Sequence, residues 1–302
     1  MRTFATLSAC LIVVCASTAA VAGTTTIKTF EKTIDKELPA DAKGIVEISN
    51  TSGSVSVSGW DRPEVKVHAE LDEGVERLDM DSANGRVNIK VVLPSNSSHR
   101  NEAQLHVQVP RGSELHVTTV SADQTIAAVA GVQRLSSVSG DVTTEIEAAD
   151  LELKSVSGDL RIKGHGQPAR LHVTTVSGDV HMDHAAGDLD AGTVSGDLGL
   201  VMDSAGAVRL RTTSGDVHFE GKLKQAANLD AATVSGDISV RAPSEGGYAY
   251  EASTFSGDIT DCFDAHAVKG TVGQTLSGTR GAGGGHVRLK AMSGDVQLCD
   301  RN

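Results

Sequence analysis

The chain has 302 residues, a formal net charge of −12 and only 3% aromatic residues. An acidic chain without a cluster of Lys or Arg is poorly suited to bind nucleic acid or an anionic membrane surface. The few aromatic residues indicate a narrow core built from Val, Leu, Ile and Ala, as stacked β-coils require.

The chain begins like an exported protein. Arg2 precedes an apolar run that includes Leu11–Val14, and small residues follow. This pattern is typical of a secretory signal, so we expect residues 1–22 to be removed. The mature chain would start near Gly23 with a charge of −13, because Arg2 is lost from the total of −12. A lipoprotein signal at Cys10 is the alternative, but the apolar run follows that cysteine instead of preceding it. We expect an extracytoplasmic protein, in the periplasm, at the cell surface or secreted, with no transmembrane segment after removal of the signal.

Residues 23–118 carry irregular β-signals. Asn50–Val55 (NTSGSV) is a weak copy of a motif that recurs later, and Pro94–Asn101 is expected to be a surface loop. Strands are expected at residues 64–70, 87–93 and 105–109. We predict an N-terminal cap with irregular β-coils here, because an uncapped solenoid would expose an open strand edge.

From residue 119 to 302 the tetrapeptide Val-Ser-Gly-Asp, or a near copy, recurs. Successive glycines are 18, 20, 18, 19, 21, 21 and 37 residues apart. A period of about twenty residues is typical of a solenoid whose repeats stack on one another. The predicted repeat corners are Gly140, Asp141, Gly158, Asp159, Gly178, Asp179, Gly196, Asp197, Gly215, Asp216, Gly236, Asp237, Gly257, Asp258, Gly294 and Asp295.

Each repeat reads as a strand, a corner and a second strand. Apolar residues stand two and four positions after most of the glycines, with mostly polar residues between them, as in Val180-His181-Met182. This alternation predicts a strand with one buried face. Glycine accepts a positive φ at the corner, while Ser and Asp side chains hydrogen-bond exposed backbone amides.

The chain resembles a bacterial "putative adhesin" family of unknown function, also called Toastrack. The resemblance rests on the order of its segments, which are a signal peptide, residues 44–67, residues 105–124 and then serial VSGD copies. The resemblance implies an all-β, single-stranded right-handed β-solenoid of the cell envelope. The spacing of the repeat glycines gives its coils a length of roughly 18–21 residues. It supplies no catalytic residue and no cofactor. We therefore expect a non-enzymatic adhesin-like binding or structural protein, a monomer whose partner is an envelope protein or a glycan.

The aspartate ladder supports two alternatives to corner capping. Stacked carboxylates about 5 Å apart suit glycoside hydrolysis, with Asp197 and Asp216 as the pair to test. The same oxygens suit structural calcium. No motif of a β-helical hydrolase or of a calcium-binding β-roll accompanies the ladder, so capping is the favoured interpretation.

Two other rows of polar residues are candidate sites. His181 and His218 share one repeat position, but the coil of Gly199 separates them by about 9–10 Å, too far for one zinc ion. A hydroxyl row is either a structural ladder or a glycan-binding surface. It consists of Ser155, Thr175, Thr193, Thr212, Thr233 and Thr254.

Cys262 and Cys299 each lie five residues after a repeat glycine. Adjacent coils would place their Cα atoms about 5 Å apart, within disulfide range, whereas a coil between them would not. We predict a disulfide that clasps the C-terminal coil. Residues 263–293 would then form one coil with an excursion, in which Gly281–Gly285 is a loop.

Overall fold

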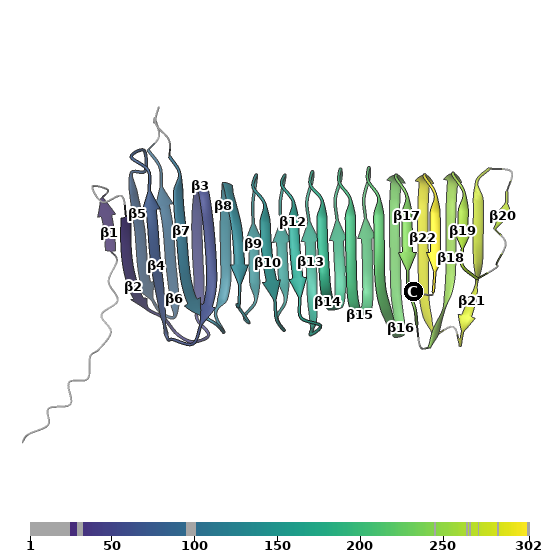
Figure 1. The fold of residues 1–302 in the computed structure, drawn as a ribbon, viewed down its shortest axis with the longest axis horizontal. Helices are drawn as coiled ribbons and strands as arrows, with labels where there is room; N and C mark the ends of the chain where they lie inside the picture. Colours follow the sequence, from purple (N-terminus) through teal and green to yellow (C-terminus); the bar gives the residue numbers. More distant parts are fainter. Residues whose placement is uncertain are drawn as a thin grey trace, which may run out of the picture.

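A computed structural model describes residues 25–28, 33–94, 101–244, 246–263, 265, 267–270, 272–282 and 284–300. These residues form an all-β body of 23 strands. The strands lie side by side along one long axis, with the N-terminal strands at one end and β20 and β21 at the other (Figure 1). No helix able to cross a lipid bilayer occurs within these ranges. The predicted signal peptide and most of the predicted loop at Pro94–Asn101 lie outside them.

The middle of the chain is a stack of parallel coils in register. Leu151 lies beside Leu171 on the strands before the corner, and Leu160 lies beside Val180 on the strands after it. We call the strands before the corners the groove face and the strands after them the aspartate face. The strands of this region are β8 (Glu114–Ala127), β9 (Gln133–Ser136), β10 (Val142–Ile146), β11 (Leu151–Lys154), β12 (Leu160–Gly164), β13 (Pro168–Thr174), β14 (Val180–Gly192), β15 (Leu198–Arg211) and β16 (Val217–Ser235).

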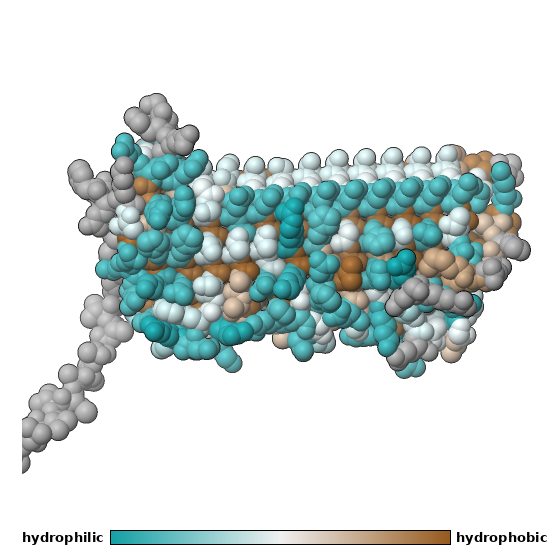
Figure 2. Space-filling model, viewed as in Figure 1, coloured by the Kyte–Doolittle hydropathy of each residue, from teal (hydrophilic) through white to brown (hydrophobic). Residues whose placement is uncertain are grey.

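Each coil sends every second side chain into a narrow core. Leu160, Val180 and Leu198 are fully buried, as the alternating sequence pattern predicts. Burying a side chain of this kind contributes about 1.5–3 kcal/mol, so each coil is stabilised mainly by its neighbours. Because the register is kept on both sides of each corner and shifts only in the return segments, side chains of one kind form lengthwise rows, which Figure 2 shows on one face of the body.

The N-terminal end mixes parallel and antiparallel pairing. Strand β3 (Ile45–Trp60) is parallel to β8 on one side and to β6 (Arg86–Val92) and β7 (Ala103–Pro110) on the other. Antiparallel strands cover this end: β5 and β1 extend from β6, and β4 and β2 extend from β7. Their bounds are β1 (Thr25–Lys28), β2 (Thr33–Pro39), β4 (Glu64–Leu71) and β5 (Arg77–Ala83).

The C-terminal end departs from the expected order of coils. Strand β22 lies between β16 and β18, and β23 lies between β17 and β19, so the last coil of the sequence sits inside the stack (Figure 1). The expectation that every repeat stacks on the preceding one is therefore wrong here. Strand β21 closes the end by pairing antiparallel with β18. The bounds are β17 (Ile238–Arg241), β18 (Gly247–Ser256), β19 (Ile259–Asp261), β20 (Val268–Lys269), β21 (Gln274–Gly281), β22 (Gly285–Ser293) and β23 (Val296–Cys299).

Candidate functional site

The corners are built for close contact between coils. Gly158 has a φ of +111°, and a Cβ atom there would lie 2.3 Å from the carbonyl oxygen of Gly140. Only glycine combines this backbone conformation with so short a distance to the neighbouring chain. The glycine of the motif is therefore a packing requirement.

The corner aspartates form a continuous chain of hydrogen bonds. In each pair the backbone N–H of one aspartate donates to the Oδ1 atom of the aspartate in the preceding coil of the stack, over 2.8–3.4 Å. Asp197 and Asp216 make the same contact as the aspartates at all the other corners, so their geometry gives no reason to single them out as catalysts. From donor to acceptor, the pairs are Asp141–Asp123, Asp159–Asp141, Asp179–Asp159, Asp197–Asp179, Asp216–Asp197, Asp237–Asp216, Asp295–Asp237 and Asp258–Asp295.

The hydroxyl row proposed as a glycan-binding surface is buried, which makes that hypothesis wrong. Its six members are only 3–7% exposed. Several of their hydroxyls donate to carbonyl oxygens of the corners, for example Thr254 to Gly294 over 2.8 Å. The row is a ladder inside the coil, because these side chains point inward just before the chain turns.

The histidines and acids do not converge on a metal site within the described residues. Gly199 lies between His181 and His218 in the strand register, as predicted from the repeat. The neighbouring His184 has its Nδ1 atom 3.1 Å from Oδ1 of Asp203, which gives it a carboxylate partner from the next coil.

The two cysteines are joined by a disulfide with their Cα atoms 5.0 Å apart. They lie in adjacent coils, but the coil of Cys299 comes before that of Cys262 in space. Residues 263–293 therefore do more than form one coil with an excursion. Within this range β20 and β21 lie beyond the stack, and β22 lies between β16 and β18.

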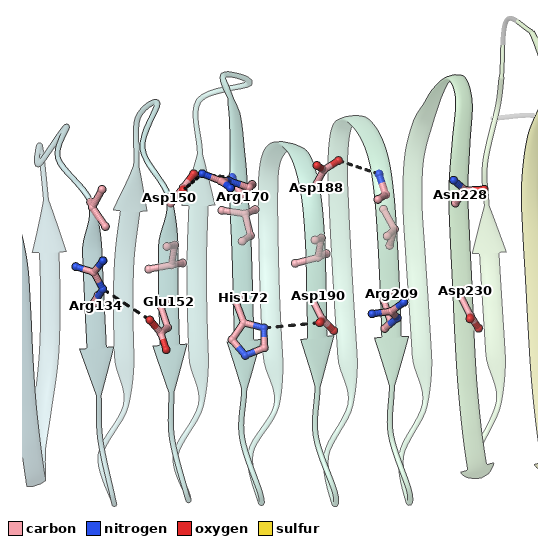
Figure 3. A pocket seen from close by; sticks show the side chains of 16 residues that line it. Arg134, Asp150, Glu152, Arg170, His172, Asp188, Asp190, Arg209, Asn228 and Asp230 are labelled. Carbon is pink, nitrogen blue, oxygen red and sulfur yellow. Dashed lines mark hydrogen bonds and ion pairs between the residues drawn. The ribbon is translucent and has the colours of Figure 1, made fainter.

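The best-defined hollow is a shallow groove of about 750 Å³ that crosses six coils of the groove face (Figure 3). Its floor is apolar, and each floor residue is only 2–3% exposed. No Phe, Tyr or Trp is among the described residues that line it. The floor is formed by Leu151, Leu171, Leu189 and Val208.

Two rows of mostly polar and charged residues flank this floor. One row stands six residues before the repeat glycines and consists of Arg134, Glu152, His172, Asp190, Arg209 and Asp230. The other stands eight residues before them and consists of Val132, Asp150, Arg170, Asp188, Ala207 and Asn228. Both signs of charge therefore line the groove at the spacing of the coils.

Most of these charges are paired within the groove. Nη2 of Arg170 lies 2.9 Å from Oδ2 of Asp150, and Nδ1 of His172 lies 3.8 Å from Oδ2 of Asp190. A hydrogen bond from Lys154, with the nearby charges of Lys154, Arg134 and His172, holds the pKa of Glu152 below its usual value. Arg209 differs from the other cations of the groove, because its guanidinium forms no hydrogen bond or ion pair with any described residue (Figure 3). Its guanidinium remains available to a ligand.

Sequence reasoning missed this groove, although its signal was present. A leucine or valine seven residues before the repeat glycine marks the buried position, so the residues on either side of it had to face outward. Reading those two flanking positions down the repeats would have revealed both charged rows.

Comparison with known proteins places the fold in context. Residues 46–299 match the model of the Toastrack DUF4097 family. A "putative adhesin" from Parabacteroides distasonis is similar, with 12% identity, a TM-score of 0.49, and coverage of 89% of this chain and 98% of that one. A "putative lipid binding protein" from the same species has 10% identity, a TM-score of 0.48, and coverage of 90% and 98%. A "putative adhesin" from Bacteroides fragilis has 11% identity, a TM-score of 0.44, and coverage of 90% and 99%. The search of curated proteins finds no significant relative.

Proposed function

Because the chain belongs to the Toastrack DUF4097 family, we propose that it is a non-enzymatic binding or structural protein of the bacterial cell envelope. The proposal includes export directed by residues 1–22 and a location in the periplasm or at the cell surface. It also includes a right-handed, single-stranded β-solenoid, with residues 23–118 as the cap and irregular coils and residues 119–302 as the regular stack. A rigid body of this kind suits the presentation of a long, flat face.

The observation that carries this proposal is the groove, and Arg209 in particular. Arg209 stands between Asp190 and Asp230 in the strand register, and its guanidinium has no hydrogen-bonding partner among the described residues. A bound carboxylate or phosphate would form charge-assisted hydrogen bonds with such a guanidinium. The acidic residues nearby disfavour a uniformly anionic polysaccharide. They favour an extended protein segment that carries both signs of charge.

A pull-down from the envelope fraction of the source bacterium tests the proposal. The purified protein should retain a partner that Arg209→Ser loses, while Arg161→Ser on the aspartate face retains it. Both changes remove one exposed arginine, so a difference between them reports the site and not the net charge. If the unmodified protein retains no envelope component, or if both variants retain it equally, the groove is not the binding site.

The enzymatic alternative is tested separately. Turnover of an envelope or plant polysaccharide that disappears in Asp197→Asn, with folding intact, would replace our proposal with catalysis. Structural calcium would be supported if the melting temperature rose with calcium and fell with a chelator. We expect neither result, because every ladder carboxylate except Asp258 already accepts a backbone hydrogen bond, and Asp258 accepts one from the side chain of Gln274.

A further inference from the structure

The valine of the repeated Val-Ser-Gly-Asp motif has no role in the corner itself. Its side chain points outward, and six of these valines are 43–50% exposed. The two C-terminal coils carry larger residues at this position, Met292 at 59% and Phe255 at 65% exposure. One coil has Thr213 instead, which shows that the corner accepts a polar residue of the same shape. The six valines are Val120, Val138, Val156, Val176, Val194 and Val234.

Together these side chains form an apolar ridge, which we call the valine ridge. It follows the corners through nine successive coils, so at the usual strand spacing it is about 38 Å long. Its exposed apolar area is on the order of 600 Å², which is at the upper end for a patch left bare on a monomer. A standard protein interface buries about 800 Å² on each partner, so the ridge and its borders are large enough to form one.

The borders of the ridge carry opposite charges. The aspartate row stands three residues after the ridge residue of each coil. A second row stands two residues before the ridge residue, and in these nine coils it contains Lys154, Arg211 and Lys290 and no acidic residue. The ridge is therefore acidic along one side and weakly basic along the other.

We propose that the valine ridge joins two copies of this chain into a parallel dimer, in place of the monomer expected from the sequence, which goes beyond the envelope-binding function. With the twofold axis along the ridge, the aspartate row of each copy faces the basic row of its partner. An antiparallel dimer would instead place the aspartate rows of the two copies opposite each other, and these rows would repel. Like-charge rows at contact distance disfavour an interface, so the charge pattern selects the parallel arrangement. An anionic lipid surface is disfavoured for the same reason, because the aspartate row would face it.

The dimer is tested by sedimentation of the purified protein over a range of concentrations. The unmodified protein should sediment as a dimer. The triple variant Val156→Thr, Val176→Thr, Val194→Thr should dissociate at least tenfold more readily with a similar melting temperature, because Thr213 already occupies this position in one coil. Val201→Thr, on the aspartate face, is the control and should leave association unchanged. A protein that is monomeric at all concentrations overturns the proposal, and so does a triple variant that loses its fold while Val201→Thr keeps it.

Cross-linking distinguishes the two orientations. In the parallel dimer Val138→Cys meets its own copy across the axis, so mild oxidation should give a covalent dimer. Thr143→Cys, exposed on the aspartate face of the same coil, should stay uncoupled. Coupling of Thr143→Cys, or a failure of Val138→Cys to couple while the protein sediments as a dimer, contradicts the proposed arrangement.

Discussion

The central coils and the C-terminal end follow different rules of assembly. From β8 to β16 each coil pairs with the one before it in the sequence. At the C-terminal end β22 and β23 instead enter between strands that precede them in the chain. The repeat thus determines how a coil turns and which residues it buries, but not which coil becomes its neighbour.

The difference arises from the need to close an open edge. A parallel coil at the end of a stack would leave backbone N–H and C=O groups free to pair with another chain. Antiparallel β21 covers β18, and the side chain of Gln274 covers the other face by bonding Asp258 and the N–H of Ile259. Because β20 and β21 form this cover and precede β22 and β23 in the chain, the coil of β22 and β23 lies inside it.

The largest predicted effect comes from breaking the inserted coil. Leu289 is fully buried between Ala231 and Ala252. Leu289→Asp would bury an unpaired carboxylate and should destabilise the C-terminal end by roughly 5 kcal/mol or more. Hydrogen exchange should then show that residues 246–300 lose protection while the central coils keep it. The control is His286→Asp, an exposed position on the same strand, which should leave protection unchanged. Equal loss of protection in both regions would mean that the end and the centre unfold as one unit.

The disulfide should stabilise the same end by a smaller amount. Cys262 and Cys299 are 37 residues apart in sequence, and closing a loop of that size contributes about 4 kcal/mol in the chain-entropy model. The double variant Cys262→Ser, Cys299→Ser should lose that stability in urea unfolding, with faster hydrogen exchange in β22 and β23. Addition of a reductant should reproduce the effect in the unmodified protein and change nothing in the variant. A stable C-terminal end in the double variant would show that packing alone holds the inserted coil.

A substitution at a corner of the central stack should reduce the stability by less. Gly215 has a φ of +148°, and a Cβ atom there would lie 2.0 Å from the carbonyl oxygen of Gly196. Gly215→Ala should therefore destabilise the stack by about 2–3 kcal/mol, as measured by urea unfolding. Gly284→Ala is the matched control, because no neighbouring atom lies within 4 Å of its would-be Cβ. Equal unfolding midpoints for the two variants would show that the corners relax easily.

The sequence predicted what is local to a repeat and missed what depends on neighbouring chain order. The alternation around Val180 placed buried residues correctly because strand geometry depends only on nearby residues. The spacing of Cys262 and Cys299 indicated adjacent coils, yet it carries no sign of which coil comes first. For the hydroxyl row the sequence left two interpretations open, because the inward direction changes at the corner and an alternating pattern cannot locate that change. The burial of the row decides for the structural ladder. The groove was missed because the residues on either side of each buried leucine, such as Arg170 and His172 beside Leu171, were not compared from repeat to repeat.

The smallest predicted effect on stability comes from a His–Asp pair between antiparallel strands at the N-terminal end. His68 on β4 lies opposite Asp35 on β2, with its Nδ1 atom 2.8 Å from Oδ1. The hydrogen bond to Asp35 raises the pKa of His68 above 6.5, and Glu70 adds to the shift. A raised pKa in the folded state stabilises the fold below the unfolded pKa, and that contribution is lost as the pH rises through the folded value. NMR titration should show the pKa of His68 falling in Asp35→Asn, and less in Glu70→Gln. The melting temperature should decline slightly between pH 6 and 8 in the unmodified protein and less in Asp35→Asn. If Asp35→Asn leaves the titration of His68 unchanged, the pair does not contribute to closing this end.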